Sequence, residues 1–146
     1  MTMRVAVFTD NDFDKINGVT TALTAVLRRA PSDIQPRIYT AATLGCDQPD
    51  YLALPSRGVG IPFYRHMKMY VPHWKQYLAR VIADRVDVLH LTTPGPMGLV
   101  ALWLRKKTGL PMVGSFHTDL AAYTELLSGS DRLGVWMREC MRWMYG

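Results

Sequence analysis

Short apolar runs alternate with amphipathic stretches along most of this chain. The apolar runs have the length of buried strands and are bounded by turn-forming residues. They cover residues 5–8, 37–42, 51–54, 86–91 and 112–116. Between the first two runs, the apolar residues follow the spacing of one face of a helix. These residues are Val19, Ala22, Leu23, Val26 and Leu27. The pattern therefore predicts strands and helices in alternation.

Proline and glycine mark the ends of the predicted helices. Pro96 begins one helix at a position that needs no N–H donor, and Gly109 and Pro111 follow its end. Other helices are predicted over residues 74–82, 120–127 and 131–145. Alternating strands and helices are typical of a parallel sheet with helices on both faces, so we expect an α/β, Rossmann-like fold.

One segment departs from this alternation. Residues 55–72 contain three prolines and two glycines, and we expect them to form an irregular excursion. The wider segment 51–83 accounts for the whole net charge of +5, because it has five basic residues, no acidic residue and six interleaved aromatic residues. A solvated basic face over aromatic core residues, contact with an anionic membrane surface and contact with nucleic acid are each compatible with this mixture.

Length and composition narrow the class of protein. The 146 residues correspond to one ordinary domain, and the hydrophobic content of 49% is enough to fill one core. Cys46 and Cys140 lack the spacing of a disulfide framework or a zinc cluster. The first residues lack the long apolar stretch of a signal peptide, and no window reaches the roughly 18 apolar residues of a membrane span. We therefore expect a cytoplasmic protein whose membrane contact is peripheral, at the inner face.

Three loops that follow predicted strands contain the residues of greatest chemical interest. Ligands of parallel sheets bind at the carboxyl ends of the strands, so residues 10–18, 92–98 and 117–119 are expected to line one cleft. In the first loop, Gly18 and Val19 begin a helix whose N–H groups could bind a phosphate, although a plain helix cap has the same residue types.

Individual residues of these loops allow further interpretations. Asp10 and Asp12 form a D-x-D pattern, which fits either a divalent metal bound to a diphosphate or two turn residues. Thr93 and Gly95 belong to a stiff, proline-flanked loop that is expected to form a wall of the cleft. His117 lies at a strand tip, where an imidazole can meet a ligand, with a capping or core role as the alternative.

Four motifs in this order resemble glycosyltransferase family 4. They are Phe8-Thr9-Asp10, Asn17-Gly18-Val19, the stretch from Leu89 to Gly98, and the stretch from Gly114 to Asp119 with Tyr123. Within that family, the motifs are most similar to the branch that glycosylates membrane lipids. This branch includes diacylglycerol glycosyltransferases, sulfoquinovosyl transferases and phosphatidylinositol mannosyltransferases.

The resemblance implies half of a GT-B enzyme. Residues 1–146 would form the N-terminal, acceptor-side domain, and a C-terminal donor-binding domain that is absent from this sequence would hold a UDP- or GDP-sugar. The family retains the anomeric configuration of the sugar and needs no essential metal. We therefore expect transfer to a lipid or saccharide acceptor, no cofactor besides the nucleotide sugar, and no activity of the chain alone. The alternative is a non-catalytic Rossmann-like module that binds a phosphorylated ligand or an anionic membrane surface.

The resemblance also implies roles for individual residues. The backbone at Gly18 and Val19 would approach the donor diphosphate, and His117 would be the catalytic residue beside the sugar and the acceptor hydroxyl. The expected acceptor and cleft residues are Asp10, Asn17, Thr93, Gly95, Thr118, Asp119 and Tyr123. Asp10 and Asp12 need not bind a metal in such an enzyme.

Two surfaces are expected to meet partners. In lipid-glycosylating relatives the basic aromatic segment contacts the membrane, and Arg65, His66 and Lys68 are the candidate contacts to anionic lipid here. No nucleic acid partner is expected. The helix predicted over residues 131–145 has a broad apolar side, which predicts either core packing or self-association through residues 131–146.

Overall fold

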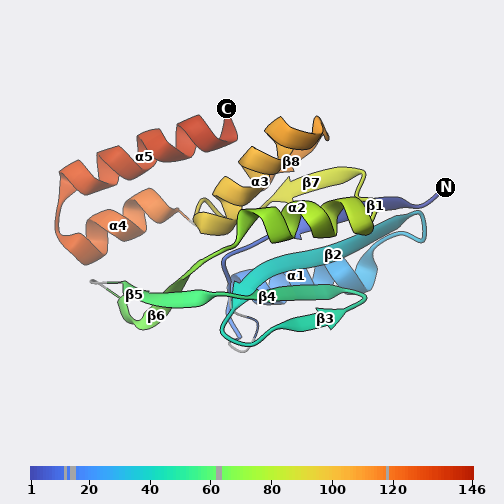
Figure 1. Cartoon of the computed structure of the whole chain (residues 1–146). Helices are drawn as coiled ribbons and strands as arrows, with labels where there is room; N and C mark the ends of the chain where they lie inside the picture. Colours follow the sequence, from blue (N-terminus) through green and yellow to red (C-terminus); the bar gives the residue numbers. More distant parts are fainter. Residues whose placement is uncertain (12, 14–15, 62–63, 118) are drawn as a thin grey trace.

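The computed structural model describes residues 1–11, 13, 16–61, 64–117 and 119–146. It consists of a six-stranded sheet, a separate two-stranded hairpin and five helices within this described part (Figure 1). In chain order the elements are β1 (Met3–Phe8), α1 (Gly18–Arg29), β2 (Ile34–Ala42), β3 (Cys46–Gln48), β4 (Tyr51–Pro55), β5 (Arg57–Ile61), β6 (Tyr64–Val71), α2 (Trp74–Ala83), β7 (Val88–Leu91), α3 (Pro96–Thr108), β8 (Met112–Gly114), α4 (Leu120–Ser128) and α5 (Asp131–Tyr145).

The main sheet has the order β3-β4-β2-β1-β7-β8. β1 pairs in parallel with β2 and β7, β2 pairs in parallel with β4, and β7 pairs in parallel with β8. The short β3, which the pattern did not predict because it has no apolar run, adds an antiparallel edge beside β4. The mostly parallel, Rossmann-like sheet is therefore confirmed. Its parallel strands place the loops after β1, β7 and β8 at the same edge.

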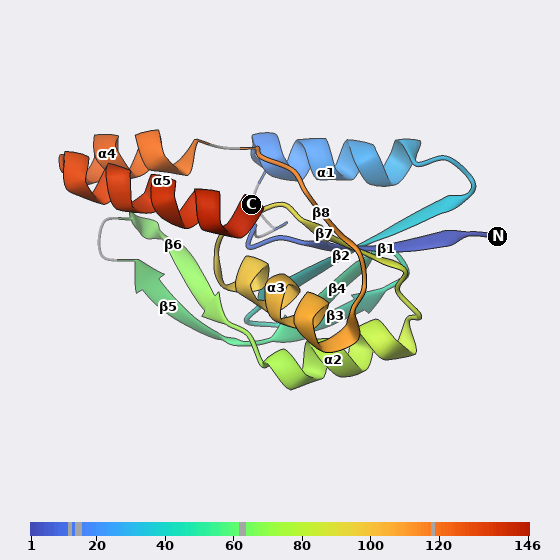
Figure 2. The ribbon, with the colours of Figure 1, turned by 90° about the horizontal axis from the view of Figure 1, so that it is seen from above.

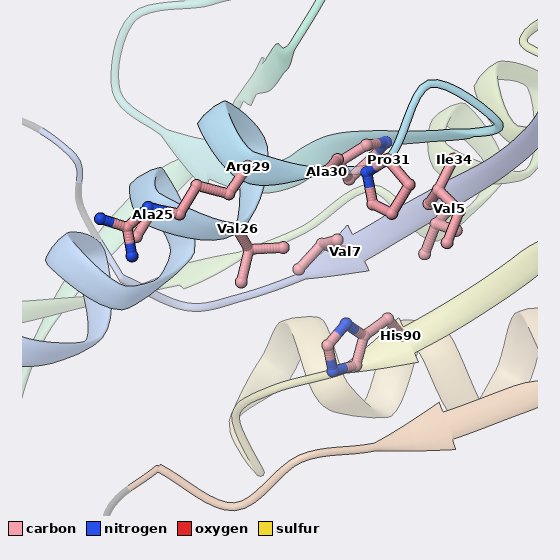
Figure 3. A pocket seen from close by; sticks show the side chains of 10 residues that line it. Val5, Val7, Ala25, Val26, Arg29, Ala30, Pro31, Ile34 and His90 are labelled. Carbon is pink, nitrogen blue, oxygen red and sulfur yellow. The ribbon is translucent and has the colours of Figure 1, made fainter.

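Helices cover both faces of the sheet, as expected, but not equally. Figure 2 shows α1 on one face, α2 and α3 on the opposite face, and α4 and α5 beyond one end. In β1, Ala6 and Phe8 belong to the larger core under α2 and α3, whereas Val7 packs with Leu23 of α1. This alternation is that of a strand buried on both faces. A groove of about 460 Å³ remains open along the α1 face, with Val26 and His90 among its lining residues (Figure 3).

The prediction of an irregular excursion over residues 55–72 is wrong. Most of this segment forms the antiparallel hairpin β5–β6, in which Arg57 pairs with Val71 and Val59 with Met69. The prolines that suggested irregular structure include Pro55 and Pro72, which flank the two strands rather than interrupt them. A Cβ at Gly58 would lie 3.3 Å from the side chains of Lys68 and Tyr70, so this glycine makes room for the opposite strand.

Helix ends follow the local chemistry of the sequence. The Asn17 side chain accepts hydrogen bonds from the N–H groups of Val19 and Thr20, both at 2.9 Å, and begins α1. Gly109 has the left-handed conformation, with a φ of 71°, and ends α3 as predicted. β1 and β2 begin earlier than predicted, at Met3 and Ile34, and β4 ends one residue later, at Pro55. Two other strands are shorter than predicted. β7 begins at Val88 instead of residue 86, and β8 ends at Gly114 instead of residue 116.

Candidate functional site

A cleft of about 680 Å³ lies at the carboxyl ends of β1, β7 and β8. All three loops that were expected to meet contribute to its lining. One side, here called the polar rim, consists of Asp10, Asn11, Asn17, Thr92, Thr93 and His117. The convergence follows from parallel pairing, because these strands end at the same edge of the sheet.

Most of the site residues expected from the sequence line this cleft. They are Asp10, Asn17, Gly18, Val19, Thr93, Gly95, His117 and Tyr123, together with Lys68 from β6. Asp119 instead begins α4, where its Oδ1 accepts a hydrogen bond of 3.0 Å from the N–H of Ala122. Asp12 and Thr118 lie outside the described residues, and so do the side chains of Arg65 and His66.

Asp10 ties β1 to the loop that precedes α3. Its N–H donates to Thr93 Oγ1 at 2.8 Å, and the Thr93 hydroxyl donates to Asp10 Oδ2 at 2.6 Å. Asp10 Oδ1 accepts a 2.8 Å hydrogen bond from the N–H of Met97 in the first turn of α3. Burial raises the pKa of Asp10 to about 6, and the hydrogen bonds from Thr93, Met97 and Gly95 partly oppose this rise.

Gly95 is needed for this arrangement. A Cβ at this position would lie 2.4 Å from Asp10 Oδ2 and 2.6 Å from Asp10 Cγ, which is far too close. The two prolines around Gly95 restrict the loop further, so the carboxylate and the backbone are held in contact. The expected wall of the cleft is therefore a hydrogen-bonded clamp between β1 and α3.

The structure gives Asp10 a role that does not require a metal. Both of its carboxylate oxygens accept hydrogen bonds from within the chain. Across the described residues, no three His, Cys, Asp or Glu side chains gather closely enough to hold a metal ion. Asp12, the second carboxylate of the D-x-D pattern, lies outside the described residues, and the two interpretations of this pattern stay open.

The N-terminus of α1 forms another part of the polar rim. Asn17 and Thr20 make a capping box, because the Thr20 hydroxyl oxygen also accepts a 2.9 Å hydrogen bond from the N–H of Asn17. The cap that the sequence allowed is thus present. A Cβ at Gly18 would meet no atom within 4 Å, so the space beside the first helical turn is open to the cleft. Diphosphate binding at Gly18 and Val19 stays a prediction.

His117 is the last member of a chain of three side chains. Its Nε2 lies 2.7 Å from Ser115 Oγ, which in turn lies 2.8 Å from Nε2 of His90. Burial lowers the pKa of His90, and the nearby His117 lowers it further. His90 and Ser115 were both expected in strands, over residues 86–91 and 112–116, and neither was expected to be a site residue. Ser115 in fact follows directly after the end of β8. Their proximity depends on the pairing of β7 with β8, which no sequence pattern specified.

The opposite side of the cleft, here called the apolar wall, comes from the hairpin, α4 and α5. It consists of Ile61, Met69, Leu120, Leu127, Leu133, Met137 and Met141. The two helices pack closely at Gly134, where a Cβ would lie 2.9 Å from Glu125 Oε2. The apolar face of residues 131–145 was expected to pack in the core or to self-associate, and Met144 does belong to the larger core. Another part of that face, including Met137 and Met141, lines the cleft.

Tyr145 closes the cleft near β8. Its ring packs edge-on against Phe116, with centroids 6.2 Å apart, and a Cβ at Gly114 would lie 2.8 Å from it. Its hydroxyl is buried and has no hydrogen-bond partner among the described side chains and backbone. Burial raises the pKa of Tyr145, and so does the charge of Asp10. Tyr145 is thus a lining residue of the cleft that the sequence did not suggest.

None of the helices in the described chain combines the length and the apolar character needed to cross a membrane. α5 leaves Val135, Trp136 and Trp143 exposed while it buries Met141 and Met144. Self-association through residues 131–146 stays a prediction.

Comparison with known proteins agrees with the motifs. The sequence pattern of the family described as Glycosyltransferase Family 4 matches residues 16–146. The chain is also similar to alpha-monoglucosyldiacylglycerol synthase of Streptococcus pneumoniae (strain ATCC BAA-255 / R6), with 22% identity over 143 residues. The similarity covers 86% of this chain but 29% of the length of that relative.

Proposed function

Because this chain belongs to glycosyltransferase family 4, we propose that it is the acceptor-side domain of an enzyme that transfers a sugar from a nucleotide sugar to a lipid. The observation that carries this proposal is the two-sided cleft. Hydroxyl, amide, carboxylate and imidazole groups line its polar rim, and aliphatic side chains line its apolar wall. A glycerolipid has the same division, with a hydroxyl at one end and acyl chains at the other.

The size and position of the cleft support this assignment. Its volume of about 680 Å³ lies within the range of roughly 300–1,000 Å³ that is usual for small-molecule sites. The acceptor hydroxyl would lie beside His117, and the acyl chains would extend along Leu127 and Met137 of the apolar wall. The name of the streptococcal relative refers to a glycosylated diacylglycerol, which supports a lipid over a soluble saccharide as the acceptor.

The polar rim would serve the reaction in two ways. The helix N-terminus at Gly18 and Val19 would face the diphosphate of a UDP- or GDP-sugar held by a second, donor-binding domain, and would stabilise the charge that develops on the leaving group. His117 would hold the acceptor hydroxyl beside the sugar. In this proposal the anomeric configuration is retained, the departing phosphate accepts the proton of the acceptor, and no metal is required.

The hairpin is proposed to contact the membrane from which the acceptor is taken. Lys68 lies on β6 and also lines the cleft, while Val59 and Val71 on the same hairpin are about half exposed. Cations beside exposed apolar side chains suit a surface of anionic lipids. The association would be peripheral.

Two adjacent leucines on α4 allow a matched test of the acceptor class. Leu127 lines the cleft, whereas Leu126 is exposed and is not part of its lining. Zwitterionic vesicles with and without diacylglycerol are incubated with the chain and sedimented. We expect diacylglycerol to increase the bound fraction of the native chain and of Leu126→Gln, and to leave that of Leu127→Gln nearly unchanged. Equal binding of the native chain to both kinds of vesicle would contradict the lipid acceptor.

Catalysis needs a separate experiment. The chain is combined with a C-terminal donor-binding domain, and transfer from UDP- and GDP-sugars to diacylglycerol is followed with a labelled sugar. Transfer that depends on both parts supports the proposal. Lipid binding without any transfer would instead indicate a non-catalytic binding module.

A further inference from the structure

The three hydrogen-bonded side chains His90, Ser115 and His117 connect the two openings of the domain. His117 lines the cleft, and His90 lines the groove on the α1 face, where its ring points toward Val7 and Val26 (Figure 3). Ser115 lies between them, 2.8 Å from Nε2 of His90 and 2.7 Å from Nε2 of His117.

The sheet itself explains how these side chains meet. His90 of β7 is paired with Val113 of β8, and the Ser115 N–H donates to the carbonyl of Leu91 at 2.9 Å. Side chains two residues apart on a strand point to the same face. Ser115 therefore follows Val113 on the side of the sheet that carries the His90 ring. The parallel pairing of β7 with the edge strand β8 sets these distances.

The protons available to His90, Ser115 and His117 restrict the directions of the two hydrogen bonds between them. Ser115 has one hydroxyl proton, so it can donate to one imidazole while it accepts from the other. A protonated His117 can only donate through Nε2. The arrangement compatible with both protonation states of His117 is the one in which His117 donates to Ser115 and Ser115 donates to His90. This arrangement requires a neutral His90 with a bare Nε2.

The surroundings of His90 favour the neutral ring. Its groove is lined by aliphatic residues of β1, β2 and α1, and the one charged residue within that described lining is Arg29, which is also a cation. From the side of β8, Ser115 and His117 face the ring. Burial and the nearby His117 both disfavour a second positive charge here, in agreement with the lowered pKa of His90.

We propose that His90 and Ser115 are positioning residues that hold the His117 ring in one orientation and in the Nε2–H tautomer. Nε2 of His117 is then committed to Ser115, and the opposite edge of the ring, with Nδ1, meets the acceptor hydroxyl. The inference rests on the proposed function in one respect, namely that His117 contacts the acceptor. It gives roles to two residues, His90 and Ser115, that lie within the family motifs but had no assigned role.

The tautomers can be observed directly in the chain without any substrate. The chain is labelled with ¹⁵N in its histidines, and long-range ¹H–¹⁵N spectra are recorded. We expect His117 to carry its proton on Nε2 and His90 on Nδ1. Ser115→Ala should give a mixture of tautomers at His117 with an unchanged circular dichroism spectrum, whereas Ser115→Thr, which keeps the hydroxyl, should restore the native pattern. A native pattern at His117 in Ser115→Ala would overturn the proposal.

The coupling of the two rings has its own readout. Because the charge of His117 lowers the pKa of His90, His117→Gln should raise the pKa of His90 toward its ordinary value. His90→Gln keeps a hydrogen-bonding group near the position of Nε2, and His90→Leu removes it. We expect His117 to keep its tautomer in the first variant and to lose it in the second. The native tautomer at His117 in both variants would mean that Ser115 alone positions His117.

Activity then separates the two proposals. In the enzyme with its donor-binding domain, Ser115→Ala is expected to lower kcat about tenfold with little change in KM, because a poorly oriented His117 ring would hold the acceptor hydroxyl less well for transfer. A defined His117 tautomer without any sugar transfer would refute the proposed function and leave the positioning intact. If Ser115→Ala gives a mixture of His117 tautomers but leaves the rate of sugar transfer unchanged, the positioning has no role in the reaction.

Discussion

The polar rim and the apolar wall of the cleft are built in different ways. The rim is held by hydrogen bonds of polar groups at strand ends and helix starts, as when Asp10 binds Thr93 and Met97, or when Asn17 binds the first turn of α1. The wall depends on the packing of a hairpin and two helices that lie beyond the end of the sheet (Figure 2). The rim therefore supplies defined orientation and chemistry, and the wall supplies apolar volume.

This difference predicts different consequences for variants. A defect in the rim should change turnover or local stability, because hydrogen bonds there hold individual groups in place. A defect in the wall should change the affinity for an apolar ligand, because many weak contacts share the binding. Leu127→Gln and its control Leu126→Gln, described above, test the wall. The following variants test the rim and its connection to the wall.

The largest effect is expected where α3 packs between Thr93 of the polar rim and α5. A Cβ at Gly98 would lie 2.2 Å from the carbonyl oxygen of Thr93 and 2.9 Å from Met144 of α5. Gly98→Ala should therefore lower the free energy of unfolding by about 3 kcal/mol, measured by urea denaturation. Gly60→Ala is the control, because its Cβ would meet no atom within 4 Å. Equal stability of both variants would show that α3 can move away from the rim without cost.

Removal of the imidazole tests the chemical role of the rim. His117→Ala in the enzyme with its donor-binding domain should lower kcat about 100-fold, because a group that orients and polarises the acceptor hydroxyl is lost. KM for the lipid should change little, since the apolar wall is intact. The measurement is initial-rate kinetics over a range of lipid concentrations. A change confined to KM would assign His117 to binding alone.

The buried carboxylate of the rim predicts a pH dependence of stability. Burial raises the pKa of Asp10 from 3.8 to about 6, so the folded state binds this proton more tightly than the unfolded state. The contribution of Asp10 to stability is then greatest near pH 4 and is lost as the pH rises through 6. The native chain should lose about 2 kcal/mol relative to Asp10→Asn between pH 4 and pH 7. Parallel unfolding curves of the two proteins across this range would contradict the prediction.

The smallest effect is expected at the cap of α1. Asn17→Ala removes the acceptor of two N–H hydrogen bonds and should lower the free energy of unfolding by about 1 kcal/mol. Asn17→Ser keeps a capping oxygen and should retain most of the stability. Thermal unfolding followed by circular dichroism distinguishes the two. If both variants lose the same stability, the side chain of Asn17 contributes something besides the cap.

Much of the fold was predictable because its signals are local. Apolar runs and helical spacing predicted five strands of the main sheet and all five described helices, and the turn residues predicted several ends, such as Gly109 after α3. The hairpin β5–β6 was not predictable in this way. Its two strands are held by each other, and glycines such as Gly58, which usually weaken a strand, here admit the opposite side chains.

The candidate site likewise has one part that was predictable from the sequence and one part that was not. The sequence by itself determined the polar rim, since the residues after parallel strands must lie at one edge of the sheet whatever the rest of the chain does. Only the tertiary structure decided that α4, α5 and the hairpin face this rim as an apolar wall, and that His90 reaches His117 through Ser115. The physical reason is the distance along the sequence over which each signal acts. Strand, helix and cap signals act over a few residues. The apolar wall and the hydrogen bonds that join His90, Ser115 and His117 depend instead on the register and packing of segments that are distant in the sequence.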